Sequence, residues 1–192
     1  MATIIPYKGK FPKIANDAFI AENAVIIGDV IIGSKSSVWY NCVIRGDVNY
    51  IRIGQETNIQ DGTIIHVGTN NGPTIIGDGI TIGHKALIHA CTLYDYSFVG
   101  MNSTIMDYAQ IKSYSMVAAG ALVTNKKIVE ENELWTGVPA KFLRKLKKEE
   151  IDYINLSKNR YVNLAKDYMY WLYSLNNYRR LYNYYGSFYV LE

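Results

Sequence analysis

The chain contains three histidines, His66, His84 and His89, all within one short stretch. Imidazole nitrogen is a common zinc ligand, and three histidines leave a fourth position of a tetrahedral ion open, as in catalytic sites. His84 and His89 are five positions apart, which fits neither ligands one turn apart on a helix nor side chains on one face of a strand. The histidines can therefore share a metal only if a longer-range feature of the fold brings them together.

That feature is a repeat of six residues. An aliphatic anchor recurs at every sixth position, usually followed by a small or polar residue, with two insertions and one slip near Leu93. The anchors are Ile14, Ile20, Ile26, Ile32, Val38, Ile44, Ile53, Ile59, Ile65, Ile76, Ile82, Ile88, Leu93, Val99, Ile105, Ile111, Val117 and Val123. The period matches neither an amphipathic helix nor an alternating strand. It is typical of a parallel β-helix, in which short strands turn at corners around an aliphatic column.

The repeat predicts a mainly β fold with about six coils. Residues 1–125 are expected to form this β-helix domain, and residues 126–192 a linker and a helical extension packed on it. One helix is predicted after the Gly-Val-Pro turn, with an apolar face formed by Phe142, Leu143, Leu146 and Ile151. A second is predicted from near Ser157 to beyond Trp171. The tyrosine-rich tail, residues 176–192, has no assigned structure and is a candidate partner surface.

The register of the repeat places the histidines. His66 and His89 each directly follow an anchor, and three repeat steps separate those anchors, so the two histidines stack in adjacent coils, ~4.8 Å apart. His84 follows its anchor by two positions, one step earlier, so it is expected on or near another face, out of easy reach of the same metal. A threefold trimer would bring His84 of one chain to His66 and His89 of the next. The alternative is that the three are ordinary surface or interface residues.

The same register places four other polar residues near this site. Arg45 follows its anchor one coil before the histidine pair, and Asp47 lies two positions further on. Gln60 and Asp61 are predicted to share the face of His84. An ion pair between Arg45 and Asp61 of neighbouring subunits is expected, with Asp47 orienting Arg45. An interface salt bridge without a catalytic role is the alternative.

Composition limits the class of protein. The net charge of +3 comes from a basic excess in residues 141–192, interpreted as a solvated helix face, so neither nucleic-acid nor membrane binding is expected. The two cysteines, Cys42 and Cys91, form no CxxC pair and predict neither a disulfide framework nor a cysteine-rich zinc site, and Cys91 is expected in the core. No signal-peptide pattern opens the sequence and no apolar run reaches ~18 residues, so a soluble cytoplasmic protein is expected.

The sequence resembles the γ-class carbonic anhydrase family, in its short bacterial branch of hexapeptide-repeat proteins. The matching stretches are "VWYNCVIRGDVNYIRIG", "TNIQDGTIIHV", "IGHKALIHAC", "VGMNSTIMDYAQI", "VAAGALVT", "GVPAKFLRKL" and "NRYVNLAKDY". The resemblance implies a left-handed, triangular β-helix with three repeats per coil. It also implies a homotrimer that binds Zn²⁺, or Fe²⁺ or Co²⁺ in its place, at each interface through His66, His84 and His89.

The resemblance further implies roles for other residues. Arg45, Asp47, Gln60 and Asp61 would support the site, and Tyr161 matches a tyrosine that can approach the metal in related proteins. Two features depart from the family. The loop "VGTNNGPTI" lacks the acidic residues that shuttle protons in the archetypal enzyme, and Ala90 replaces the usual glycine beside a ligand.

The expected activity is reversible hydration of carbon dioxide, a small-molecule substrate, by a metal-bound hydroxide, with Gln60 as a candidate to orient the hydroxide or the substrate. Three alternatives remain open from the sequence. A hexapeptide acyltransferase would use one histidine as base and an acyl-CoA donor. A thioesterase would keep the metal site. A metal-stabilised trimeric scaffold would have no catalytic role.

Overall fold

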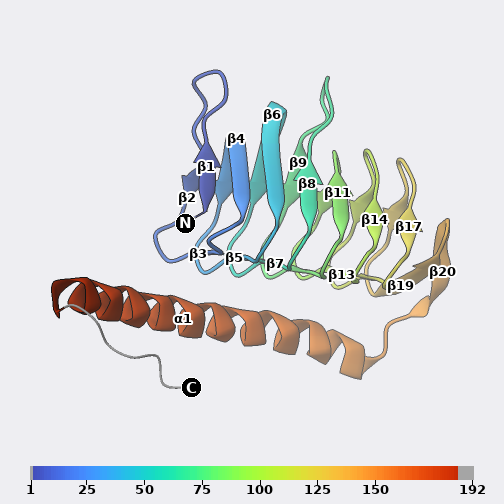
Figure 1. Cartoon of the computed structure of the whole chain (residues 1–192). Coiled ribbons are helices and arrows are strands. Elements are labelled where there is room, and N and C mark those ends of the chain that lie inside the picture. Colours follow the sequence, from blue (N-terminus) through green and yellow to red (C-terminus); the bar gives the residue numbers. More distant parts are fainter. Residues whose placement is uncertain (1, 186–192) are drawn as a thin grey trace.

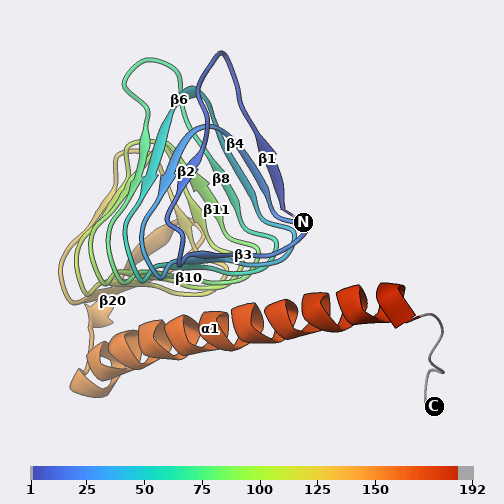
Figure 2. The same ribbon diagram turned by 90° about the vertical axis from the view of Figure 1, so that its left-hand side faces the viewer.

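The computed structural model describes residues 2–185, and it confirms the parallel β-helix (Figure 1). Viewed along its axis, the coils have a triangular outline (Figure 2). In chain order the strands are β1 (Thr3–Ile5), β2 (Lys13–Ile14), β3 (Phe19–Ile20), β4 (Val25–Ile32), β5 (Ser37–Val38), β6 (Val43–Ile53), β7 (Asn58–Ile59), β8 (Ile64–His66), β9 (Thr74–Ile76), β10 (Thr81–Ile82), β11 (Leu87–His89), β12 (Thr92–Leu93), β13 (Phe98–Val99), β14 (Thr104–Ile105), β15 (Gln110–Ile111), β16 (Met116–Val117), β17 (Leu122–Val123), β18 (Ile128–Val129), β19 (Glu133–Gly137) and β20 (Ala140–Lys145). The helix is α1 (Lys148–Tyr185).

The strands form three faces. The α1 face, which the helix covers, contains β3, β5, β7, β10, β13, β16, β19 and β20. The face that we call the histidine face contains β1, the first halves of β4 and β6, β8, β11, β14 and β17. The open face contains β2, the second halves of β4 and β6, β9, β12, β15 and β18. Because β4 and β6 turn a corner without interruption, the histidine and open faces belong to one sheet.

The aliphatic anchors stack from coil to coil in the predicted register. Ile44, Ile65, Ile88 and Ile105 are paired in successive strands of the histidine face and are fully buried. Each buried isoleucine contributes about 1.5–3 kcal/mol relative to an exposed one. This column fixes every strand in its register, because a slip by one residue would turn the anchors to solvent.

The repeat continues further than predicted. The prediction that it ends at Val123 is wrong, because Ile128–Val129 forms β18, which pairs in parallel with β15, and β19 pairs in parallel with β16. Val129 is fully buried and Trp135 packs against the core. The β-helix therefore has about seven turns and extends past residue 125. The charged residues around Val129 obscured this last part of the pattern in the sequence.

The helix predicted after Pro139 is also wrong. Residues 140–145 form β20, which folds back as an antiparallel partner of β19, with Trp135 opposite Phe142. Phe142 and Leu143, expected on a buried helix face, are exposed. Pairing with the free edge of β19 satisfies backbone groups that a helix would have satisfied internally. A single helix, α1, therefore replaces the two that were expected.

Helix α1 packs along the α1 face and continues past the end of the prism that holds β3 (Figure 1). Ile154 and Ala165 are buried, and Ser157 and Lys158 bind Thr81 and Glu56 at 3.1 and 2.7 Å. The tyrosine-rich tail extends α1 as far as Tyr185, and residues 186–192 lie outside the described part. No helix in residues 2–185 is long and apolar enough to cross a membrane.

Candidate metal centre

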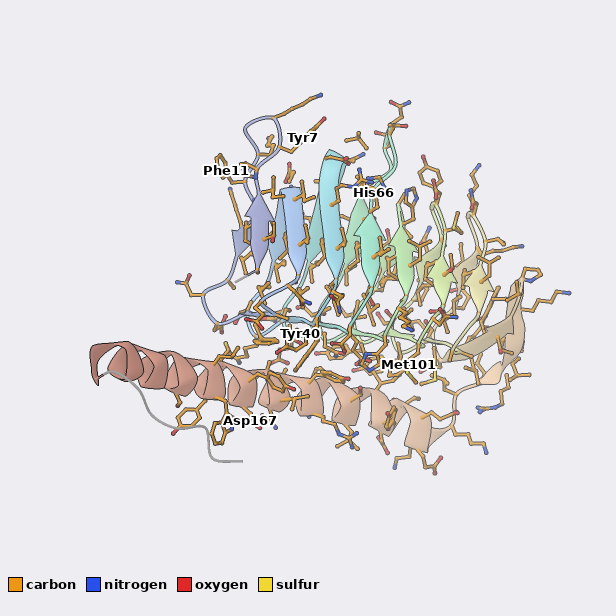
Figure 3. All side chains as sticks on the ribbon, in the orientation of Figure 1. Tyr7, Phe11, Tyr40, His66, Met101 and Asp167 are labelled. Carbon is orange, nitrogen blue, oxygen red and sulfur yellow. The ribbon has the colours of Figure 1, made fainter. Side chains whose placement is uncertain are left out.

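His66 and His89 come together as the register predicts. They end β8 and β11 and are direct partners in adjacent strands. His66 Nδ1 lies 3.3 Å from His89 Nε2, and the ring centroids are 5.3 Å apart. Figure 3 shows His66 at the edge of the histidine face that lies far from α1. The two imidazoles thus form one side-chain pair, held by strand pairing.

In each histidine of the pair, the other ring nitrogen contacts a carboxylate. Asp47 Oδ1 lies 3.0 Å from His66 Nε2, and Asp107 Oδ1 lies 2.7 Å from His89 Nδ1. Metal-binding histidines are usually held in this way, because a carboxylate on one nitrogen fixes the ring and leaves the other nitrogen free. The pair therefore has the arrangement of two oriented ligands.

Asp47 is itself held by several donors. It forms an ion pair with Arg45 and accepts a 2.8 Å hydrogen bond from the Val48 amide. Burial acts to raise the pKa of Asp47, but hydrogen bonds from Val48, His66 and Arg45 outweigh it and lower the pKa to about 2. Directly before Asp47, Gly46 pairs with Gly28 of β4. Gly28 has a φ of +79°, and an added Cβ there would collide with the Gly46 carbonyl oxygen, so only glycine fits at this corner.

His84 lies at the opposite edge of the histidine face. It is in the turn between β10 and β11, whereas His66 and His89 end their strands at the far edge. His84 Nδ1 lies 2.8 Å from Asp61 Oδ2, and its side chain is 41% exposed. This placement fits the expectation that His84 is out of easy reach of a metal bound by the pair in its own chain. Within residues 2–185, no three His, Cys, Asp or Glu side chains of one chain gather at a common point that could hold a metal.

Gln60 and Asp61 lie at the corner of His84, as the register predicts. Asn58 and Ile59 pair with Thr81 and Ile82. Gln60 and Asp61, which follow Ile59, therefore lie at the same corner as His84, one coil earlier. Gln60 is buried, and its amide donates to Asn58 Oδ1 at 3.0 Å. Asp61 also accepts the Tyr40 amide at 3.2 Å. Arg45 and Asp61 are at opposite edges, so a contact between them would require two chains.

Tyr161 projects from α1 toward the same corner. Its ring meets Trp39 edge-on, with the centroids 5.6 Å apart. Burial raises the pKa of Tyr161, and the nearby charge of Asp61 raises it further. The hydroxyl therefore remains a hydrogen-bond donor at neutral pH.

One residue of the site was not predicted. Asp107 is not among the residues that the sequence predicted, although the repeat contains the signal that identifies it. It follows the anchor Ile105 by two positions, and Ile105 is the direct partner of Ile88, the anchor before His89. A search for carboxylates one coil after each histidine would have identified it.

The histidine pair fits two ligands of a divalent metal. Two nitrogens bound to one tetrahedral zinc at ~2.0–2.1 Å lie roughly 3.3–3.4 Å apart. The 3.3 Å between His66 Nδ1 and His89 Nε2 agrees with that separation, although a hydrogen bond between two imidazoles has a similar length. The carboxylate on each remaining nitrogen favours the metal interpretation, since it leaves the facing nitrogens for a ligand to share.

The chain is similar to known proteins over most of its length. A family model described as "Bacterial transferase hexapeptide (six repeats)" matches residues 11–46. A carbonic anhydrase of Geobacillus kaustophilus is 43% identical, over 86% of this chain and 90% of that protein. The mitochondrial gamma carbonic anhydrase 2 of Arabidopsis thaliana is 48% identical over 85% of this chain, which spans 61% of that protein's length. The crystal structure of a hexapeptide transferase family protein from Anaplasma phagocytophilum has a TM-score of 0.84 and 50% identity, and covers 86% of this chain and 98% of that one.

Proposed function

The chain belongs to the gamma carbonic anhydrase family of hexapeptide-repeat proteins, and on this premise we propose that it is a metal-dependent carbonic anhydrase. It interconverts carbon dioxide and bicarbonate at sites shared between the subunits of a homotrimer. The observation that carries the proposal is the His66–His89 pair, in which two facing nitrogens are 3.3 Å apart and each ring is held by its own aspartate.

The trimer follows from where the two halves of the site lie. His66 and His89 are at one edge of the histidine face and His84 is at the other. If three copies pack around an axis in front of this face, the His84 edge of each chain meets the paired edge of the next. An outward row of aliphatic side chains, with Ile64 47% and Leu87 36% exposed, lies between the edges. Burying this row between subunits would supply apolar contact area for the association.

The proposed metal ligands are His66 and His89 of one chain and His84 of its neighbour. Three neutral imidazoles suit zinc, and Fe²⁺ or Co²⁺ could take its place. When bound with an open coordination position, such an ion would lower the pKa of a water to about 7 and so supply a nucleophile at neutral pH.

The other residues act by holding and orienting groups. Asp47 fixes the His66 ring, and Arg45 fixes Asp47. Asp61 holds Nδ1 of His84, which leaves its Nε2 to face a neighbouring chain. Gln60 is proposed to hold an oxygen of the substrate with its amide, because it lies at the corner of His84. Tyr161 is proposed to donate its hydroxyl hydrogen toward the same site.

Two measurements on purified protein test the proposal. Metal analysis should find about one ion per chain. Stopped-flow hydration of carbon dioxide by zinc-loaded and iron-loaded protein should show a rate that a chelator abolishes and added metal restores. His89→Ala should lose this rate, whereas Asp95→Asn, at a corner away from the histidines, should keep it. A rate no higher than that of His89→Ala would overturn the proposal.

Acyl transfer is the second candidate, favoured by the name of the Anaplasma relative. A transferase needs only one histidine as base. Acyl transfer would therefore give no role to the other two histidines or to the aspartates that contact them. The same metal analysis separates the two candidates. Protein that contains no bound metal and that transfers an acyl group from acetyl-CoA would favour this alternative.

A further inference from the structure

Asp107 makes a contact that has no role in strand pairing or in the core. It lies in the turn between β14 and β15, and its main-chain carbonyl accepts the Lys126 amide at 2.9 Å. The backbone of Asp107 is thus held by the next coil. Its side chain, about one quarter exposed, reaches back one coil to His89, with Oδ1 2.7 Å from Nδ1.

This contact determines which nitrogen of His89 is free. An aspartate carboxylate accepts hydrogen bonds, so the short contact requires a hydrogen on Nδ1. In the neutral imidazole Nε2 then carries the lone pair, and Nε2 is the atom that faces His66 at 3.3 Å. Without Asp107, His89 would be free to adopt the other tautomer or to rotate away from His66.

We propose that Asp107 is a positioning residue of the metal centre. It holds the His89 ring with Nε2 directed at the position that a metal would occupy, and it makes that nitrogen a stronger metal ligand. This inference rests on the proposed function, because it assumes that the pair binds a divalent ion. It adds to the site a third aspartate, on the coil that follows the histidine pair.

Asp107 has fewer partners than Asp47, so its substitution tests the contact with His89 alone. The Asp47 carboxylate also binds Arg45 and the Val48 amide, so its loss would disturb the β6 corner. Among the described residues, the only hydrogen bond found for the Asp107 carboxylate is the one to His89. Substitution of Asp107 should therefore affect His89 and leave the fold intact.

The test compares Asp107→Asn and Asp107→Ala with Asp107→Glu and Asp95→Asn. Asp95 is a matched control, because its carboxylate accepts the Asp78 amide at 2.8 Å and touches no histidine. Zinc dissociation constants are measured by competition with a chromophoric chelator. We expect a 10–100-fold weaker affinity in the Asn and Ala variants, partial recovery with Glu, and less than a twofold change in Asp95→Asn. Wild-type affinity in Asp107→Ala would overturn the proposal.

A second readout needs no metal. Nitrogen-15 NMR of the imidazoles should show His89 protonated at Nδ1 in the wild type, with that preference lost in Asp107→Ala. If the wild type binds no zinc, the proposed function fails, but the NMR result still decides whether Asp107 sets the His89 tautomer. An unchanged His89 spectrum in Asp107→Ala would overturn the inference by itself.

Discussion

At the scale of single residues, each histidine is matched with an aspartate from a neighbouring coil. Asp47 and Asp61 come from the coil before His66 and His84, and Asp107 comes from the coil after His89. Successive coils of a β-helix repeat the same backbone position at about 4.8 Å. At that spacing a short carboxylate reaches an imidazole one coil away, so a rigid strand ladder sets the orientation of every ring.

Unlike the histidines, the two cysteines are core residues, although Cys91 is only two positions from His89. Both are buried, which confirms the prediction of core packing for Cys91. Burial raises the pKa of the Cys42 thiol to about 11 and also raises the pKa of Cys91. Thiolate, the reactive form, is therefore scarce at neutral pH.

We expect neither cysteine to react with Ellman's reagent at pH 8 in the native protein within minutes. Both should react after unfolding in guanidinium chloride. Lys127→Cys, which places a thiol on an exposed side chain, should react at once and give one equivalent per chain without denaturant. Rapid native reaction of Cys42 or Cys91 would contradict this prediction.

At the scale of elements, the junction of β20 and α1 depends on one carboxylate. Glu150 accepts two 2.7 Å hydrogen bonds from Arg144 and a 2.8 Å bond from the Lys147 amide. It lies in the first turn of α1, where free amides and the helix dipole favour negative charge. The Arg144 hydrogen bond, followed by that of Lys147, lowers the pKa of Glu150 from 4.5 to about 2.

The lowered pKa predicts that Glu150→Gln destabilises the folded protein by an amount that depends on pH. A depressed carboxyl pKa stabilises the folded state above the unfolded value, near pH 4.5, and this contribution is lost as the pH falls toward 2. Because the pair is partly exposed and therefore screened by solvent, we expect the melting temperature to fall by only about 2–4 °C at pH 7. The difference from the wild type should shrink between pH 4.5 and pH 2.

Thermal unfolding followed by circular dichroism measures this difference. Glu149→Gln, at the exposed neighbouring position, is the matched control and should change the melting temperature little at any pH. A Glu150→Gln effect that stayed constant from pH 7 to pH 2 would show that the charge of Glu150 does not stabilise the junction.

At the scale of the whole molecule, the proposed site exists only between chains. One edge of the histidine face provides His66 and His89, the other provides His84, and exposed Ile64 and Leu87 lie between them. A face with complementary edges favours a closed ring of copies, since each chain then offers one half-site to each neighbour.

Mixed trimers test this arrangement directly. Chains with His84→Ala keep the paired half, and chains with His89→Ala keep the other half, so neither variant alone should hold zinc. After refolding together in equal amounts, about a quarter of the interfaces should join two intact halves, if chains associate at random around a threefold axis. Zinc content should therefore recover to about a quarter of the wild-type value.

A second mixture provides the control. His66→Ala and His89→Ala damage the same half of the site, so their mixed trimers should contain no intact interface. Zinc recovery in this mixture, or none in the first, would rule out a site divided between chains in the proposed way.

The sequence by itself determined the β-helix and the stacking of His66 on His89. A period of six with fixed corners converts spacing along the chain into position in space, so the register could be counted from Ile65 to Ile88. The same counting placed Asp47 beside Arg45 and Gln60 beside His84.

Only the tertiary structure decided the rest. Residues 140–145 have an amphipathic pattern that suits a helix, and the free edge of β19 made them a strand. Val129 joined the core despite its charged neighbours, because β15 offered it a parallel partner. His84 proved to lie across the same face from the pair, and Asp107 to hold His89. These outcomes depend on contacts between residues of different coils, and a local pattern of residues does not show which of those contacts form.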